Sequence, residues 1–411
     1  MKITSVFLIS VMLLGCFYTQ KIFAQNIQLV NGMWFDGNKF SNRKVWIYDG
    51  KLSFKSRGKK TDKTIDIKGK YVIPPFGEAH NHNLESEYEL QKRIDKYLSD
   101  GVFYVKLQSS IKKRIAPLMH NYNHPLGLDV SLTYAPITGS GGHPIAVRKS
   151  YLEQGLFGNL FKTLEEIESH GYFTIDTEKD LAAKWDSVLS FKPDFIKVVL
   201  VYSEEYEKRK DDSSYFGQKG LNPKFLPDVV KKSHQAGLRV SVHVNTPMDF
   251  HNAIMSGADE IAHLPGYSND LKITRQDAKM AAEKNIVVVT TAALVKKRNK
   301  DPNYDKFVEN VKHNLKILKD AGVKLAVGSD EYNDTSLSEV TYLAETGVFS
   351  NLELLKMWSE ASAETIFPNR KIGKLKEGYE ASFLVLSGNP IENFENFQKI
   401  EMRVKQGHFL K

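Results

Sequence analysis

The sequence predicts an α/β protein: a (β/α)8 TIM barrel with a small composite β-sandwich domain built from both ends of the chain. Two observations carry this prediction. Between residues 73 and 374, short apolar runs alternate with amphipathic stretches, which is the pattern of parallel strands and their covering helices. Alternating β patterns with turn residues are confined to residues 25–72 and 375–411. A chain of 411 residues is long enough to bury the cores of both parts.

Residues 1–24 have the pattern of a secretory signal peptide. Lys2 precedes an apolar run over residues 3–14, which is too short for a stable membrane-spanning helix. Cleavage after Ala24 is the preferred processing, and a lipoprotein-like sequence ending in Cys16 is the alternative, which would place a lipid anchor there. We therefore expect export to the periplasm or the outer surface. Because Cys16 is the only cysteine, any metal in the mature fold must be held by nitrogen and oxygen atoms.

The two chain ends share a β pattern. Residues 26–66 alternate apolar and polar side chains between turn dipeptides such as Asp36-Gly37 and Asp49-Gly50. The same pattern returns only at residues 381–386 and 400–407. The simplest arrangement pairs these segments in one domain beside the central body.

The central body contains eight apolar runs. In order they are VIPPFGEAH, VFYVKLQ, LDVSLTYAPI, DFIKVVL, RVSVHV, DEIAHL, IVVVTTAA and KLAVGSD. Amphipathic stretches lie between them, for example at residues 85–98, 177–189, 227–235, 276–284 and 304–320. Gly101, Gly237 and Gly322 follow such stretches, as glycine commonly does at a helix C-terminus. Eight such units fit a barrel better than an open sheet of about six strands.

The charge pattern bears on partners. The net charge is +8, but lysines and arginines are scattered, and no helix-turn-helix, zinc-finger or RNA-binding pattern is present. We therefore expect a small-molecule substrate and no nucleic-acid partner. A solvated basic surface explains the charge, and a preference for anionic substrates is an open alternative.

Polar residues end several of the predicted strands, where a barrel of this kind places its functional site. His80 and His82 end the first run, and residues two apart on a strand point to one side, so both imidazoles can reach one metal ion. The others are Lys197 on the fourth strand, His243 on the fifth, His263 on the sixth and Asp330 on the eighth. His143 follows the third strand in a glycine-rich segment that lacks the Lys-Ser/Thr of a phosphate-binding loop.

Each of these residues also has a structural interpretation. Lys197 could extend its ammonium to water, and His243 or His263 could be a core histidine with satisfied hydrogen bonds. Asp330 could cap a helix. Their coincidence at one set of strand ends favours a metal site over these separate explanations.

The order His80-x-His82, Lys197, His243, His263 and Asp330 resembles the amidohydrolase superfamily. The flanking segments Val72-Ile73-Pro74, Asp194-Phe195-Ile196-Lys197 and Gly373-Lys374-Leu375-Lys376-Glu377-Gly378 support the resemblance. Gly141-Gly142-His143 is similar to the loop of the imidazolonepropionase-like and Xaa-Pro or Xaa-Arg dipeptidase branch.

The resemblance implies an exported metal-dependent hydrolase that cleaves an amide C–N bond, in a dipeptide or an N-acyl amino acid. It implies two divalent metal ions, zinc by default, bridged by hydroxide and by a carboxylated Lys197. His80, His82 and Asp330 would hold one ion, and His243 and His263 the other. Asp330 would also act as the catalytic base and acid. His143 and Tyr202 are expected to contact the substrate.

The sequence departs from the family pattern at several positions. Pro75 stands where glycine is usual, Glu78 where aspartate is common, and Pro144-Ile145 follows His143 in place of a further glycine. No glutamate follows His243 closely, which argues against a mononuclear deaminase. A cyclic-amide or imidazolone hydrolase, a lactonase and a phosphotriesterase-like enzyme remain alternatives for the same site. A catalytically retired periplasmic binding protein is the non-enzymatic alternative.

Overall fold

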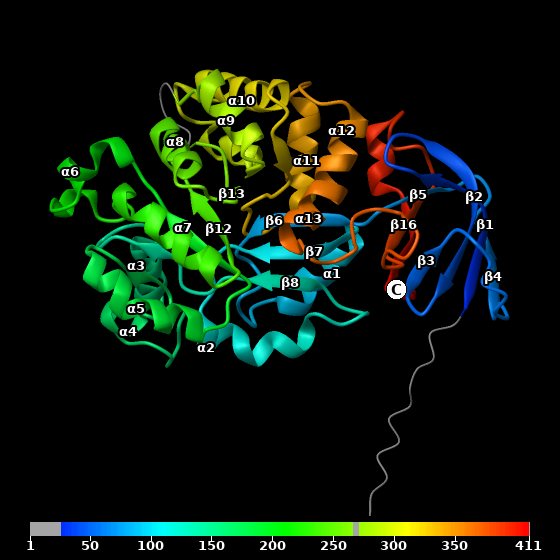
Figure 1. Cartoon of the computed structure of the whole chain (residues 1–411), viewed down its shortest axis with the longest axis horizontal. Coiled ribbons are helices and arrows are strands. Elements are labelled where there is room, and N and C mark those ends of the chain that lie inside the picture. The colour runs from blue at the N-terminus through cyan, green and yellow to red at the C-terminus, as the bar shows by residue number, and fades with distance from the viewer. Residues whose placement is uncertain (1–25, 266–270, 411) are drawn as a thin grey trace, which may run out of the picture.

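The structure, a computed structural model, describes residues 26–265 and 271–410 (Figure 1). The predicted signal peptide and Cys16 lie outside these residues. The described strands form three sheets, one of eight strands beside a body that contains sheets of seven and three strands. In the described part of the chain, no helix combines the length and apolar character needed to cross a bilayer.

The eight-stranded sheet contains strands from both chain ends. Its strands are β1 (Ile27–Phe35), β2 (Phe40–Tyr48), β3 (Lys51–Ser53), β4 (Lys63–Asp66), β5 (Tyr71–Ile73), β16 (Phe383–Leu386), β17 (Ile400–Lys405) and β18 (His408–Leu410). The antiparallel pairing of β5 with β16, with Val72 opposite Val385, joins the two ends. The ends therefore share a sheet, as expected, whereas a sandwich with boundaries at residues 72 and 375 stays a prediction.

The strands of the central body are parallel. Three of them, β6 (Phe76–Asn81), β7 (Val102–Leu107) and β8 (Asp129–Leu132), form one sheet. The other sheet contains β9 (Ile137–Thr138), β10 (Phe173–Thr174), β11 (Phe195–Val199), β12 (Arg239–His243), β13 (Glu260–Ile261), β14 (Val287–Val289) and β15 (Lys324–Ala326), in the order β10-β9-β11-β12-β13-β14-β15. Each of the eight predicted apolar runs contains a strand. The first run is divided, because Pro74-Pro75 separates β5 in one sheet from β6 in the other.

Backbone hydrogen bonds also connect the two parallel sheets. The Asp194 N–H donates to the Leu132 carbonyl at 2.8 Å, which links the start of β11 to β8. The Ala79 N–H donates to the Val327 carbonyl at 2.9 Å, which links β6 to the segment after β15. The body is thus a parallel α/β fold, and its closure as a single eight-stranded barrel stays a prediction.

Helices surround these strands (Figure 1). Five of them lie on the predicted amphipathic stretches: α1 (Leu90–Ser99), α5 (Glu178–Ser190), α7 (Leu226–Gln235), α9 (Arg275–Glu283) and α10 (Tyr304–Asp320). The others are α2 (Lys112–Ile115), α3 (Ile145–Glu153), α4 (Leu164–Ile167), α6 (Tyr206–Arg209), α8 (Pro247–Met255), α11 (Ser336–Glu345), α12 (Asn351–Leu355) and α13 (Ser362–Ile366). Thr177 begins α5 with a capping box to Asp180, which satisfies backbone donors at the start of the helix.

Aromatic packing at the base of β6 joins the body to the C-terminal segment. The Phe76 and Trp358 rings are stacked, with centroids 3.5 Å apart, and both are fully buried. Phe397, just before β17, meets Phe76 with a centroid distance of 6.0 Å. Large buried rings contribute much of the apolar burial that stabilises a core. This cluster therefore anchors the strand whose other end carries His80.

Candidate metal centre

His80 and His82 lie together at the end of β6, as the strand geometry predicts. His80 Nδ1 donates to the Ala262 carbonyl at 2.6 Å, so its Nε2 keeps a free lone pair. The two Nε2 atoms are 3.2 Å apart. Two imidazole nitrogens therefore face the same point.

Asp330 reaches this point from the segment after β15. Its N–H donates to the His80 carbonyl at 2.8 Å, and its Oδ1 lies 3.6 Å from His80 Nε2 and 3.5 Å from His82 Nε2. The approach requires Gly328, because a Cβ there would stand 2.6 Å from the His80 nitrogen. His80, His82 and Asp330 together offer three ligand atoms close enough to hold one metal ion.

His243 and His263 form a second pair beside the first. His243 Nδ1 and His263 Nε2 are 2.7 Å apart, and the His80 and His263 ring centroids are 5.7 Å apart. His243 Nε2 contacts Asn245 Oδ1 at 3.0 Å, and His263 Nδ1 donates to the Leu264 carbonyl at 2.9 Å. With these nitrogens as donors, the two that face each other both carry lone pairs. A cation bound by both nitrogens would remove that repulsion.

The imidazoles are uncharged at neutral pH. Burial, with the nearby Lys197 charge, lowers the pKa of His82 and that of His263 to about 3. Burial likewise holds the pKa of His80 and that of His243 well below their usual range. Neutral imidazole is the form that binds metal ions.

Lys197 is buried within β11, with 4% of its surface exposed. Among the described residues its Nζ has no hydrogen-bond partner. Burial lowers the pKa of this ammonium to about 7, although Glu260 and Asp330 raise it. An unpaired buried amine is costly, so its position needs a chemical explanation.

The structure thus brings together all six predicted ligands: His80, His82, Lys197, His243, His263 and Asp330. Hydrogen-bond acceptors dominate the cluster, and nitrogen and carboxylate oxygen atoms suit divalent ions such as zinc. The donor set fits the metal centre that the sequence predicted, and the ligand roles stay predictions.

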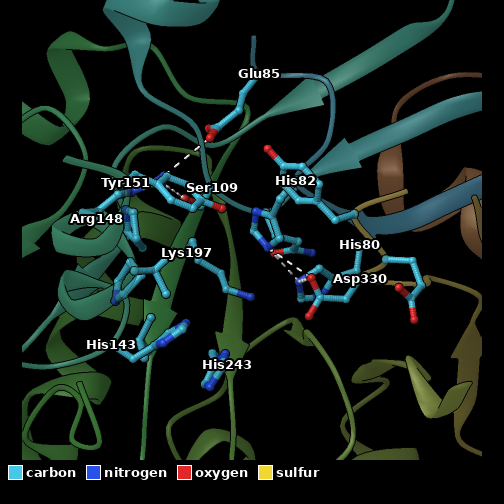
Figure 2. A pocket seen from close by; sticks show the side chains of 17 residues that line it. His80, His82, Glu85, Ser109, His143, Arg148, Tyr151, Lys197, His243 and Asp330 are labelled. Carbon is cyan, nitrogen blue, oxygen red and sulfur yellow. Dashed lines mark hydrogen bonds and ion pairs between the residues drawn. The ribbon is translucent and has the colours of Figure 1, made fainter. Parts of the chain in front are cut away.

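A cavity of about 260 Å³ opens onto this cluster (Figure 2). His143 lines it, as predicted, and its ring stacks on His243 with centroids 4.8 Å apart. Burial lowers the pKa of His143 to about 4. Tyr202 is not among the lining residues, and the Arg209 guanidinium lies 3.7 Å from the centre of its ring. The geometry therefore gives no support to the prediction that Tyr202 contacts substrate.

Sequence reasoning missed several lining residues. These are Glu85, Gln108, Ser109, Val147, Arg148, Tyr151, Glu331 and Tyr332. The position of some of these residues in the sequence could have indicated them. Helix α3 begins directly after the segment that carries His143, so its first turns reach the same end of the body as His143. Arg148 and Tyr151 lie on those turns.

These features define a class of protein. Its members have a parallel α/β body and carry a cluster of potential metal ligands, nitrogen and oxygen atoms, at the carboxyl ends of the strands. Comparison with known proteins is more specific. The model of the amidohydrolase family matches residues 194–410, which is more than half of the chain. The chain belongs to the amidohydrolase family.

Related proteins agree with this assignment. The chain is similar to ochratoxinase from Aspergillus niger, with 26% identity over 217 residues, a match that covers 49% of this chain and 43% of that protein. The matched part is thus less than half of the curated relative. The crystal structure of A. niger ochratoxinase superposes with a TM-score of 0.74 at 18% identity, covering 94% of this chain and 95% of that one. A prolidase structure complexed with N-methylphosphonate-L-proline gives 0.72 at 19% identity, covering 94% and 100%. The likeness to these structures shows the shared fold.

Proposed function

We propose that this protein is a metal-dependent hydrolase that cleaves an amide C–N bond in a small substrate, such as a dipeptide or an N-acyl amino acid. The observation that carries the proposal is the convergence of acceptor atoms from His80, His82, His243, His263 and Asp330 around Lys197. The names of its similar proteins, ochratoxinase and prolidase, agree with an amide substrate.

The donor set divides naturally between two divalent ions, with zinc as the default. His80, His82 and Asp330 would hold one, and His243 and His263 the other. Bound divalent ions would lower the pKa of a water molecule and polarise the substrate carbonyl.

Lys197 would join the two halves of the site after carboxylation. The neutral amine adds to carbon dioxide and loses one proton, which gives a carbamate anion. The pKa of about 7, lowered by burial, supplies neutral amine near physiological pH, and the absence of a partner for Nζ among the described residues leaves it free to react. The product would replace a costly buried cation with an anion suited to bind cations.

Asp330 is placed to move the proton during hydrolysis. It would accept a proton from the attacking water as the C–O bond forms, and return it to the amide nitrogen as the C–N bond breaks. Burial raises the pKa of Asp330 to about 7, against the lowering effect of Lys197. Bound divalent ions would lower this pKa and favour the carboxylate, which is the form that accepts the proton of the attacking water.

We also propose that the two parallel sheets close into one (β/α)8 barrel and that the protein is exported. Barrel closure is supported by the hydrogen bond from Ala79 to Val327 and by that from Asp194 to Leu132.

Export is supported by Lys2 and the apolar run over residues 3–14. Fractionation of cells that produce the wild-type chain or Cys16→Ala would test export and lipid attachment.

The experiment that tests the function is metal analysis of protein purified without chelators and with bicarbonate present. It is combined with hydrolysis assays on dipeptides, N-acyl amino acids, lactones and cyclic imides. We expect about two ions per chain in the wild type and one or none in Lys197→Ala, with hydrolysis reduced at least about 100-fold. Lys284→Ala is the control, because Lys284 donates to the Ile254 carbonyl and does not line the cavity.

Two results would reject the proposal. Metal content and hydrolysis that are unchanged in Lys197→Ala would reduce Lys197 to a structural residue. Absence of metal from the wild type, together with tight binding of a small ligand, would favour a retired binding protein.

A further inference from the structure

We propose that the cavity contains an anion subsite built around Arg148, which binds a free carboxylate of the substrate. The inference rests on the proposed hydrolase function and narrows its substrate to amides that carry a carboxylate, such as dipeptides or N-acyl amino acids with an unblocked C-terminus. The metal cluster and Arg148 line one cavity.

Arg148 is a buried cation with unused hydrogen-bonding capacity. It projects from α3, only 4% of its surface is exposed, and among the described residues its Nε–H has no partner. Its guanidinium donates to Ser109 Oγ at 2.5 Å and contacts Glu85 Oε1 at 3.5 Å. A buried guanidinium N–H without an acceptor is costly unless a ligand supplies one, and a carboxylate fits the planar fork of donors.

The local charge favours an anion over a cation. Glu85 is the acidic residue that contacts Arg148, and it faces both Arg148 at 3.5 Å and Arg114 at 3.8 Å. Two guanidinium groups against one carboxylate leave a net positive charge. Glu85 Oε2 has no hydrogen-bond partner within the part of the chain that the structure describes, but a substrate amine that bound there would approach two arginines.

The position of Arg148 suits a substrate that spans the cavity. In Figure 2, Arg148, Ser109 and Tyr151 lie on one side and His80 and Asp330 on the other, with Lys197 between them. Apolar side chains line much of the remaining wall, namely Pro136, Pro144, Val147 and Val199. The geometry holds a carboxylate at one end of the substrate while the amide meets the metal ligands at the other.

The test compares matched substrates. The wild type is assayed with a panel of N-acetyl-L-amino acids and with the corresponding C-terminal carboxamides. We expect kcat/KM to be about 10- to 100-fold higher for the acids, because a charged hydrogen bond is lost in the amides. Arg148→Met should remove this preference by lowering the rates for the acids alone. Arg148→Lys, which keeps a charge beside Glu85, should retain part of it.

Arg114→Met is the matched control, because Arg114 contacts Glu85 but does not line the cavity. Its preference for acids should stay within about twofold of the wild type, as expected for a residue without ligand contact. Equal rates for acids and amides in the wild type would overturn the subsite. So would a preference that survives in Arg148→Met, or a preference for substrates with a cationic end.

Calorimetric titration with the same N-acetyl-L-amino acids separates the two proposals. If the wild type hydrolyses nothing, the hydrolase proposal fails. Binding of the acids that is lost in Arg148→Met and kept in Arg114→Met would still support the subsite. Absent binding, or binding that is unchanged in Arg148→Met, would overturn it.

Discussion

The Glu78 carboxyl group accepts two hydrogen bonds from Ser329. The Ser329 N–H donates to Oε1 at 2.7 Å, and its hydroxyl donates to Oε2 at 2.8 Å. Both residues are fully buried. Glu78 stands two positions before His80, and Ser329 directly precedes Asp330. This pair therefore fixes the segment after β15 against β6 and sets where Asp330 lies relative to the histidine pair.

We predict that Ser329→Ala lowers kcat by about 10- to 100-fold while KM changes little, because small displacements of a catalytic group act mainly on the transition state. It should also cost about 1–3 kcal/mol of unfolding free energy, since Glu78 Oε2 and the Asn81 amide lose a buried partner. Steady-state kinetics and urea unfolding measure the two effects. The control Ser256→Ala removes a hydroxyl that donates to the Asn252 carbonyl on α8. Unchanged kcat in Ser329→Ala would contradict the positioning role.

The parts of this site that follow from chain-local geometry could be predicted from the sequence. His80 and His82 share a side because they are two apart at the end of a strand. Lys197 and His243 lie on strands with clear apolar patterns, and these strands, β11 and β12, pair as neighbours in one parallel sheet. The shared β sheet of the chain ends followed from alternation at both ends.

Other parts depend on tertiary packing that no local pattern encodes. Arg148 contacts Glu85 although the two residues are 63 positions apart in the sequence, and only the folded chain brings them together. From the sequence, Tyr202 is expected to contact the substrate. Tyr202 has a positive φ of 53°, and its ring packs against Arg209 and does not line the cavity. The pairing of β6 with β7 contains two irregularities, which a strand pattern does not reveal.

Removal of the metal should destabilise the fold, because ions that bind only the folded chain add to its stability. At a free-ion concentration about 100 times the dissociation constant the contribution is about 3 kcal/mol. Treatment with a chelator should therefore lower Tm by several degrees, and zinc in the presence of bicarbonate should restore it. His82→Asn should show a smaller shift, since one ligand is missing. A Tm that is insensitive to chelator in the wild type would contradict a resident metal.

The buried carboxyl group of Glu339 links the stability of the fold to pH. Glu339 on α11 accepts hydrogen bonds from the N–H groups of Ala292 and Ala293, at 2.8 and 2.7 Å. Burial raises the pKa of Glu339 from 4.5 to about 7, although these hydrogen bonds lower it. Between those values the folded chain holds a proton that the unfolded chain has lost. The resulting stabilisation is complete below about pH 4.5 and disappears as the pH rises through about 7.

We predict that this pH-dependent stabilisation is missing from Glu339→Gln, because the glutamine side chain cannot titrate. The difference in unfolding free energy between wild type and Glu339→Gln should fall by up to about 3 kcal/mol as the pH rises from about 4.5 to 8. Urea unfolding at a series of pH values measures it. A difference that stays constant over this range would show that Glu339 is ionised throughout. Subtracting the variant removes the contributions of the other titrating groups, which both chains share.

Lys405 joins the C-terminal strands to the body. Its fully buried Nζ donates to the carbonyls of His124 and Gly127, at 2.8 and 2.6 Å, and to Asp129 Oδ1 at 2.6 Å. Lys405→Met should cost about 3–5 kcal/mol, because it leaves a buried carboxylate and two carbonyls without this donor. Since Lys405 does not line the cavity, kcat/KM well below Tm should stay within about twofold of the wild type. If unfolding becomes biphasic in Lys405→Met, the contacts of Lys405 make the eight-stranded sheet and the body unfold together. An unchanged free energy of unfolding would contradict the structural role of Lys405.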